Sequence, residues 1–520
     1  MDIVRLGRLF RTVRGLPAFF GKPLDIGTSL DALKTRMERR TENFLSSAAI
    51  VYGVPHNPFR RLLLSAGCEY ADLESGVLSR GIEKTLEALR AEGVFLSYDE
   101  FKSGIPVVRG GVAFETRPED FDNPRLAGGT IAASTSGTRS SRSMRVPYDW
   151  DFIADEAANE CALSAAHGIL DAPQALWYPG LPGIAGIHNV LISAKYRRPP
   201  DRWFAHGSDR DMRQPFGRNL AVRALPVLGR LYGLRLPRPE PTNLEDAPRV
   251  ARWLAETAAE HGISVLRGFT GSVVRAVQAA LENNLDIKRS VLFTGGEPLT
   301  AARRKFIESS GARVYPRYIA TETGLIAAAC PHGEPPDEMH VYLDRLAVLP
   351  QENGGGLQYT TLLPGAGKIL LNTDIGDGGR LSQKPCPCLF GALGMDVRVS
   401  EVGSRERITI EGMTVAVHEL DDALGRVATD AGGNPDDIRF QEVRDERNFG
   451  RLRIVAGPSL GGVDENRLID GLFGNLESRD SGHRMTTRIW RQAGSVEVVR
   501  GGPEYSEGFK RRIVERPERP

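Results

Sequence analysis

The sequence predicts an α/β protein with a large N-terminal domain of mixed sheets and flanking helices, followed by a small α+β domain. The first observation is an alternation of short apolar runs and helix-like patterns between residues 247 and 320, which is typical of α/β units. The second is a change near residue 400, beyond which two helices and a strand pair are expected. A chain of 520 residues is also too long for one ordinary domain. We therefore expect domains at residues 1–402 and 403–520.

The composition is that of a globular protein without general affinity for nucleic acids or membranes. The formal net charge is +1, so neither sign dominates the surface. No apolar run approaches the roughly 18 residues that a membrane span needs. The basic, amphipathic N-terminus lacks the continuous apolar core of a secretory signal. We expect it to form a docking helix or a frayed end, with a surface-binding helix as the alternative.

The N-terminal part is expected to begin with helices and to continue as strands and loops. Residues 29–46, 76–93 and 150–167 show apolar side chains at helical spacing. Phe101 to Thr130 is broken by glycine and proline, and a loop of small hydroxyl residues, one glycine and two arginines follows. Backbone N–H groups, hydroxyls and guanidinium groups can together hold a phosphate. A flexible serine-rich surface loop is the alternative.

The middle of the chain predicts a pocket wall and then an irregular connection. Residues 175–192 are apolar and rich in glycine, and His188 would be the titratable group of a pocket that they line. A histidine with a purely structural role is the alternative. Residues 198–245 are rich in proline and arginine and predict a long irregular connection. Residues 247–284 predict helices around a strand at Ile263 to Arg267.

Two polar loops are expected at the ends of two neighbouring strands. The apolar run Ser290 to Phe293 leads into a glycine-containing loop, and a helix is expected from Thr300 to Ser309. A second strand, Ala312 to Tyr315, leads into residues 318–322. Because ligands bind outside the carboxyl ends of strands in open α/β sheets, we expect both loops to face one nucleotide pocket.

The remaining chain predicts more sheet and then the small domain. Strands are expected at His340 to Val348 and Leu357 to Leu363. Beyond residue 400 the pattern predicts, in order, a strand and turn, a helix, a strand pair and a helix, at Arg405–Gly412, Val417–Val427, Arg439–Glu442 with Arg451–Val455, and 464–478.

Five cysteines, sparse and odd in number, argue against a disulfide framework and indicate a cytoplasmic protein. Cys386 and Cys388 flank a proline, so their thiolates could share a cation. Cys330 with either His332 or His340 would complete a tetrahedral zinc site of structural type. Buried, inert cysteines are the alternative.

Several of these motifs occur in an order that resembles the adenylate-forming superfamily, which includes acyl-CoA synthetases, nonribosomal adenylation domains and luciferases. They are Thr135-Ser136-Gly137-Thr138, Gly295-Gly296-Glu297-Pro298, Tyr318-x-x-Thr321-Glu322, Gly376-Asp377 and Lys510. Residues 100–102 with 106–110, residues 121–124 and residues 405–413 resemble more closely the branch of phenylacetate-CoA ligases and bioluminescence acyl-protein synthetases.

The resemblance implies ATP-dependent activation of a carboxylate through an acyl-AMP, with release of pyrophosphate. A thiol of CoA or of a carrier protein, or an amine, would then accept the acyl group. The acid would be small and largely apolar or aromatic, because Trp177 to Ile192 and residues 263–272 carry few formal charges. A homodimer is considered as the assembly. The alternatives are a degenerate, non-catalytic nucleotide- or acyl-binding member and a scaffold protein.

The resemblance also implies which residues bind the nucleotide. The phosphates would be held by the hydroxyl-rich loop, that is by Thr135, Ser136, Gly137, Thr138 and Arg139. Adenine would pack along Gly295, Gly296, Glu297 and Pro298. Tyr318 would lie against the base, and Asp377 would accept hydrogen bonds from the ribose hydroxyls.

Three residues would carry the chemistry by the same resemblance. Thr321 would contact the α-phosphate, Glu322 would hold Mg²⁺, and Lys510 would bridge the acid and the α-phosphate from a domain that pivots near residues 403–406. The chain departs from the family pattern at Arg139 to Arg142, where a second glycine and a lysine are usual, and at Phe509, where glycine is usual. For the zinc site the resemblance favours His340.

Overall fold

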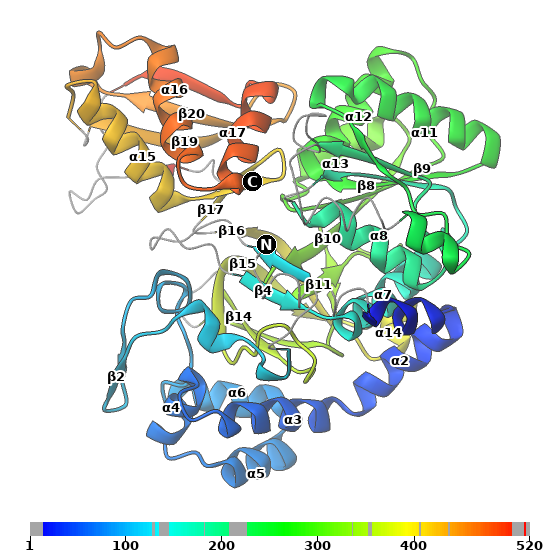
Figure 1. The fold of residues 1–520 in the computed structure, drawn as a ribbon, viewed down its shortest axis with the longest axis vertical. Helices are drawn as coiled ribbons and strands as arrows, with labels where there is room; N and C mark the ends of the chain where they lie inside the picture. The colour runs from blue at the N-terminus through cyan, green and yellow to red at the C-terminus, as the bar shows by residue number, and fades with distance from the viewer. Residues whose placement is uncertain are drawn as a thin grey trace.

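The computed structural model describes residues 14–126, 131–134, 145–180, 183–206, 226–334, 336–351, 356–404, 407–434, 437–501 and 514–515. Twelve strands of this part of the chain form one large sheet, in the order β13-β14-β15-β16-β12-β11-β10-β9-β8-β5-β6-β7 (Figure 1). Strand β10 (Arg313–Ala320) lies where a parallel half and a mostly antiparallel half meet. The predicted α/β class with mixed sheet and flanking helices is confirmed.

The parallel half contains the strands expected from the alternating apolar runs. They are β5 (Gln174–Pro179), β6 (Arg202–His206), β7 (Pro239–Pro241), β8 (Ser264–Phe269) and β9 (Ser290–Gly295). The helices of this half are α8 (Ala185–Lys195), α11 (Ala247–His261), α12 (Thr270–Glu282) and α13 (Ala301–Ser309). Strands β5 and β9 are buried throughout, because helices cover both faces of a parallel sheet.

One prediction for this half is wrong. Residues 198–245 were expected to be irregular, yet they contain β6 and β7. Strand β6 forms because Trp203, Phe204 and Ala205 are all buried between neighbouring layers. The high proline content of this segment therefore obscured a short core strand in the sequence pattern.

The other half of the sheet is mostly antiparallel. Its strands are β11 (Gly324–Ala328), β12 (Met339–Val341), β13 (Leu346–Pro350), β14 (Gly356–Thr361), β15 (Thr373–Gln383) and β16 (Val397–Ser404). Strand β10 pairs with β9 over Arg313–Pro316 and with β11 over Arg317–Ala320. Strand β10 does not end at Tyr315 as expected, because its later residues pair with β11. Tyr318 thus lies in a strand and not in a loop.

Further short elements occur between residues 99 and 392. The hairpin β1 (Val107–Arg109) and β2 (Val112–Phe114) follows a single π-helical turn, η1 (Asp99–Ser103). A second pair is β3 (Ile131–Ser134) and β4 (Arg145–Tyr148). The one-turn helix α14 (Leu389–Ala392) lies between β15 and β16.

The N-terminal helices are shorter than the apolar pattern predicted. They are α2 (Ile26–Glu38), α3 (Arg40–Gly53), α4 (Pro58–Ser65), α5 (Tyr70–Arg80) and α6 (Ile82–Ala91). Gly81 has a φ of +86°, which interrupts the helix expected at 76–93. In Figure 1, α3–α6 lie at the end of the molecule opposite to the C-terminal elements.

Residues 14–21 form a helix that docks on the body, as expected for the amphipathic N-terminus. Leu16, Phe19 and Phe20 are buried. The buried Lys195 ammonium donates to Phe19 O (2.8 Å) and Lys22 O (2.7 Å) and so satisfies carbonyls at the end of this helix. The earlier part of the amphipathic stretch lies outside the described residues.

Helix α7 (Trp150–Ala166) confirms the helix expected at 150–167 and carries two buried carboxylates. Glu160 Oε1 lies 2.6 Å from Arg317 Nη1 on β10, and Oε2 pairs with Arg267 on β8. Burial opposes the charge, but the two guanidinium groups lower the pKa of Glu160 below its ordinary value. One turn earlier, Glu156 Oε1 accepts from Leu325 N at 2.8 Å. Helix α7 is therefore fixed to three strands.

The C-terminal unit, the described residues from Arg407 onward, forms its own sheets (orange in Figure 1). After the hairpin β17 (Arg407–Ile410) and β18 (Met413–Ala416), the elements are α15 (Val417–Asp430), β19 (Ile438–Arg444), β20 (Gly450–Ala456), α16 (Glu465–Glu477), α17 (Ser481–Ala493), β21 (Val496–Arg500) and β22 (Val514–Glu515). The expected helices and strand pair are present, and α17 and β21 were not predicted. Among all described residues, no helix is long and apolar enough to cross a bilayer.

A buried histidine ties two helices of the C-terminal unit together. His483 Nε2 lies 3.3 Å from Glu419 Oε1 on α15, and His483 Nδ1 lies 3.1 Å from Asp480 Oδ1. Burial opposes the positive charge, but the two carboxylates raise the pKa of His483 to about 9. Protonated His483 therefore stabilises the packing of α17 against α15.

We expect the C-terminal unit to lose stability as the pH rises through about 9. Because the pKa of His483 rises from 6.5 to about 9 on folding, the contribution is complete below about pH 6.5 and lost at alkaline pH. It amounts to at most about 3 kcal/mol. Hydrogen-exchange protection of α17 at about pH 6 and about pH 9.5 measures the loss. His483→Gln should abolish this pH dependence, and an unchanged profile would contradict the assignment.

Candidate functional site

Two residues of the predicted nucleotide site are in direct contact. Tyr318 OH on β10 donates to Asp377 Oδ2 on β15 at 2.7 Å, and Arg407 Nη2 lies 2.7 Å from Asp377 Oδ1. Tyr359 OH lies 2.8 Å from Tyr318 OH. Burial, with the adjacent carboxylate, raises the pKa of Tyr318 well above its ordinary value, so its hydroxyl stays a donor. The fold thus joins residues 59 positions apart.

The predicted magnesium ligand Glu322 is buried in the turn between β10 and β11. Its Oε1 pairs with the buried Lys102 ammonium on η1. Among the described residues, its Oε2 has no hydrogen-bond partner, and the same holds for the buried hydroxyls of Thr294 and Thr323. A buried polar atom without a partner carries a desolvation cost that a bound ligand, ion or water would remove. A carboxylate oxygen is a ligand that Mg²⁺ prefers, so Glu322 Oε2 fits such an ion.

Thr321, predicted to contact the α-phosphate, is half-buried in the same turn. Its carbonyl oxygen accepts from Tyr148 OH at 2.6 Å, which fixes the backbone at this point. The Tyr148 ring also lies 5.4 Å from the His188 ring, in a stacked arrangement. His188 Nε2 is 2.9 Å from Glu156 Oε2, which supports the structural alternative for this histidine.

The segment Gly295 to Pro298 lies at the boundary with the C-terminal unit. Glu297 Oε2 is 2.8 Å from Arg303 Nη2, and Glu297 Oε1 accepts from Gly412 N at 2.6 Å. Gly296 and Gly412 both have positive φ, and a Cβ at either would come within 2.7 Å of the Phe269 ring. The Glu297 carboxylate is thus occupied by protein groups, and the adenine contact of this segment stays a prediction.

Two groups of predicted residues lie outside the described part of the chain. They are the hydroxyl-rich loop with Thr135, Ser136, Gly137, Thr138 and Arg139, and the candidate catalytic Lys510. Of the proposed pivot at residues 403–406, the structure describes residues 403 and 404 but not residues 405 and 406. The structure therefore brings together Tyr318, Asp377 and the turn with Glu322 in one region of the sheet.

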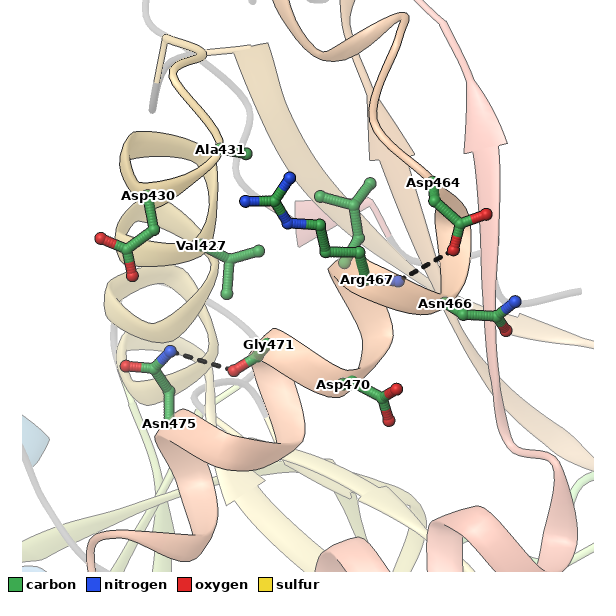
Figure 2. Close-up of a pocket in the computed structure, with 10 residues that line it drawn as sticks. Val427, Asp430, Ala431, Asp464, Asn466, Arg467, Asp470, Gly471 and Asn475 are labelled. Atoms are coloured by element: carbon green, nitrogen blue, oxygen red, sulfur yellow. Dashed lines mark hydrogen bonds between the residues drawn. The ribbon is translucent and has the colours of Figure 1, made fainter.

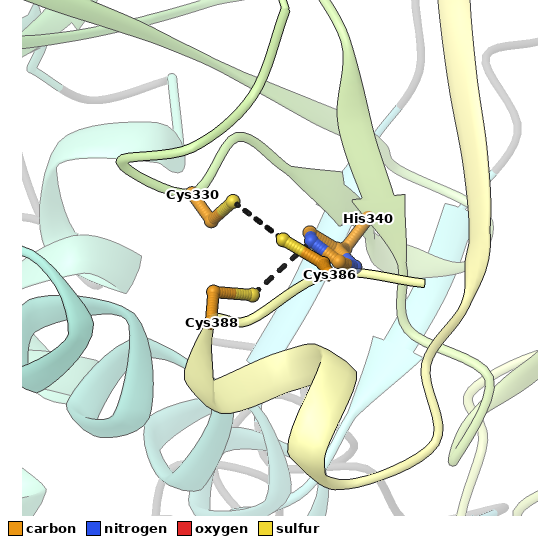
Figure 3. Close-up of side chains that lie close together, drawn as sticks. All are labelled: Cys330, His340, Cys386 and Cys388. Carbon is orange, nitrogen blue, oxygen red and sulfur yellow. Dashed lines mark hydrogen bonds between the residues drawn. The ribbon is translucent and has the colours of Figure 1, made fainter. Parts of the chain in front are cut away.

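The predicted cysteines and His340 form a compact cluster (Figure 3). Cys330 follows β11, His340 lies in β12, and Cys386 and Cys388 precede α14. One nitrogen or sulfur atom from each lies within 4.8 Å of those of the others, and no described His332 atom belongs to this group. Cys330 Sγ is 3.8 Å from Cys386 Sγ, and Cys388 Sγ is 3.2 Å from His340 Nε2.

These distances fit a tetrahedral metal centre. Two sulfurs bound to zinc at about 2.3 Å lie about 3.8 Å apart, far beyond the length of a disulfide. His340 Nδ1 is 2.7 Å from Met395 O, which leaves Nε2 available to a metal. Cys330 and His340 lower the pKa of the Cys388 thiol, so a thiolate forms readily. All four ligands come from the protein, which is typical of a structural site.

A separate pocket of about 500 Å³ lies between α15 and α16 in the C-terminal unit (Figure 2). Arg467 and Asp430 are among its lining residues, and none of the predicted site residues is. The hydrogen bonds among the residues drawn in Figure 2 are local to α16 and its cap, from Arg467 N to Asp464 and from Asn475 to Gly471 O. We assign it no chemistry.

Three residues of the site were not predicted, namely Lys102, Tyr359 and Arg407. Lys102 and Arg407 lie in segments that resemble the phenylacetate-CoA ligase branch, but nothing in the sequence indicated their partners. Lys102 and Glu322 are 220 residues apart, so only the fold pairs them. The sequence signal for Lys102 and Arg407 was the family resemblance of the segments that contain them.

No protein-family model and no curated protein matches the chain. Solved structures of adenylate-forming enzymes are similar to it. An acyl-CoA synthetase (AMP-forming)/AMP-acid ligase II-like protein from Dyadobacter fermentans has 15% identity, over 73% of this chain and 87% of that one, with a TM-score of 0.28. o-Succinylbenzoate CoA synthetase from Bacillus subtilis has 12% identity, over 74% and 68%, with a TM-score of 0.41.

An amide bond synthetase from Marinactinospora thermotolerans has 12% identity, over 92% of this chain and 93% of that one, with a TM-score of 0.40. At such identities and TM-scores these similarities decide nothing about activity, which is inferred below from the residues themselves. The closer resemblance to phenylacetate-CoA ligases also stays a prediction.

We expect the purified protein to contain about one zinc ion per chain. Cys388→Ser or His340→Ala removes a ligand and should lower the zinc content and the thermal stability together, because binding energy of a structural metal is folding energy. Elemental analysis and thermal unfolding measure both. Cys68→Ser is the matched control, since Cys68 lies outside the cluster. Less than about half an equivalent, in protein never exposed to chelator, contradicts the site.

Proposed function

We propose that the protein is an ATP-dependent ligase that activates a carboxylic acid as an acyl-adenylate. The acid carboxylate attacks the α-phosphorus of ATP, the bond to the β-phosphate oxygen breaks, and pyrophosphate leaves. A thiol of CoA or of a carrier protein, or an amine, then attacks the acyl carbonyl and AMP leaves. The observation that carries this proposal is the buried Glu322 carboxylate with an unpartnered oxygen, close in the fold to the joined pair Tyr318 and Asp377.

Each described residue has a defined part in this proposal. Asp377 accepts hydrogen bonds from the ribose hydroxyls, and Tyr318 lies against the base. Thr321 contacts the α-phosphate, and Glu322 holds Mg²⁺, which neutralises phosphate charge when it is bound. Catalysis of this kind depends on positioning and on charge neutralisation. Gly295 to Pro298 pack along adenine.

The parts outside the described residues complete the proposal. The loop of Thr135 to Arg139 holds the phosphates, and Lys510 bridges the acid and the α-phosphate. Residues 1–402 form the domain that binds ATP and acid, and residues 403–520 form a lid that turns between the two half-reactions. The acid is apolar or aromatic, and the cluster of Cys330, His340, Cys386 and Cys388 binds structural zinc.

The second candidate is a nucleotide- or acyl-binding protein without catalysis. The departures from the family pattern at residues 139–142 and at Phe509 favour it. This candidate predicts ATP binding without any exchange reaction.

We expect carboxylate-dependent exchange between pyrophosphate and ATP when the protein is assayed with a panel of apolar and aromatic acids. Lys510→Ala should lower the exchange rate about 100-fold or more, because it removes the charge that stabilises the transition state. Lys34→Ala is the matched control, since Lys34 is an exposed lysine in a surface ion pair. Folded protein that exchanges with no acid contradicts the ligase, and exchange that survives Lys510→Ala contradicts only the role of Lys510.

A further inference from the structure

Lys102 is a buried cation in contact with the proposed magnesium ligand. Its side chain is 3% exposed and that of Glu322 is 1% exposed. Its Nζ donates to Glu322 Oε1. A buried ion pair is weak evidence for stability, because desolvation of both charges offsets their attraction. Stability alone therefore does not explain why this ion pair is buried.

The two oxygens of the Glu322 carboxylate differ in their surroundings. Lys102 holds Oε1, whereas Oε2 is buried and has no hydrogen-bond partner in the part of the chain that the structure describes. Leaving a buried carboxylate oxygen unpartnered costs free energy. One oxygen held by a neighbour and the other left open is the arrangement of a metal ligand whose direction is set by a second residue.

The turn that carries Lys102 is fixed on both sides. Within η1, Glu100 pairs with Arg109 of the next strand. Just before η1, Leu96 N donates to Asn372 O at 3.2 Å and Leu96 O accepts from Asp374 N at 2.9 Å. These bonds attach the segment to β15, the strand that carries Asp377. A π-helical turn is itself rare and is frequent at functional sites.

The neighbouring cations have carboxylate partners of their own. Arg407 pairs with Asp377 at 2.7 Å, and Lys368 pairs with Asp122 at 2.5 Å. Among the described residues, Lys102 is therefore the cation that the structure places on Glu322.

We propose that Lys102 is a positioning residue of the nucleotide site, whose ammonium holds Glu322 Oε1 so that Oε2 is presented to the divalent cation bound with ATP. Lys102 contacts no reacting atom and acts through Glu322. The inference rests on the proposed function, because it requires that the site bind ATP with a metal ion. By this inference, the segment of residues 99–103 contributes to metal binding.

Titration calorimetry with ATP, in the presence of Mg²⁺ and in the presence of EDTA, tests this on the full-length protein without acid. The ratio of the two dissociation constants measures the metal-dependent part of ATP binding. We expect Mg²⁺ to tighten binding by wild-type protein at least about tenfold. Lys102→Met should lower this ratio about 10-fold or more, as loss of a residue that orients a metal ligand does. Lys102→Arg should recover part of it.

A double-mutant comparison separates positioning from simple destabilisation. Glu322→Gln should lower the ratio, and adding Lys102→Met to it should lower the ratio no further. Lys195→Met is the matched control, because Lys195 is a buried lysine whose ammonium donates to the backbone carbonyls of Phe19 and Lys22, far from Glu322 in the sequence. It should reduce stability and leave the ratio unchanged.

The outcomes distinguish this inference from the proposed function. A folded Lys102→Met protein with the wild-type ratio overturns the inference alone. Wild-type protein that binds ATP equally with and without Mg²⁺ also overturns it. Wild-type protein that binds no ATP overturns the proposed function, and the inference with it. Where Lys102→Met does not fold, Lys102→Gln provides the same comparison.

Discussion

Two buried carboxylates on helix α7 hold the two halves of the sheet together. Glu160 binds arginines from β8 and β10, and Glu156 binds the first turn of β11. Because both are fully buried, the loss of either would leave an unpaired guanidinium or backbone donor in the core, which costs several kcal/mol. Strand β10 continues directly into the turn with Glu322. The position of the candidate site therefore depends on this helix.

The C-terminal unit contributes to the site from its first residue. Arg407 begins β17 and pairs with Asp377, and the turn after β17 places Gly412 N on Glu297. Both contacts cross from the C-terminal unit to the large sheet. In the proposed reaction, a rotation of residues 403–520 would break them. The same rotation would also have to break other contacts across this boundary, among them the ion pair of Arg275 with Glu411 and the hydrogen bond from Arg303 Nε to Asn448 O.

The sequence predicted those features that depend on local pattern. Strands β8 and β9 and helices α7 and α13 follow from apolar periodicity. The three cysteines of the cluster follow from ligand spacing, whereas His340 was favoured by the family resemblance. The end of β10 was missed because a partner on its second edge, and not its own residues, extends it. The break between α5 and α6 was missed because it depends on the positive φ of Gly81. The partner of Glu322 was missed because long-range pairing of two buried charges leaves no periodic signal.

Both edges of the large sheet end in proline-containing strands. In β7, Pro239 and Pro241 have no N–H group to offer to a further strand. At the other edge, β13 ends in Pro350, whose carbonyl already accepts from Arg90 Nη1 at 2.6 Å. Open edges are the usual starting points for edge-to-edge association of sheets. The prolines therefore make both edges of the twelve-stranded sheet poorer templates for a strand of a neighbouring copy.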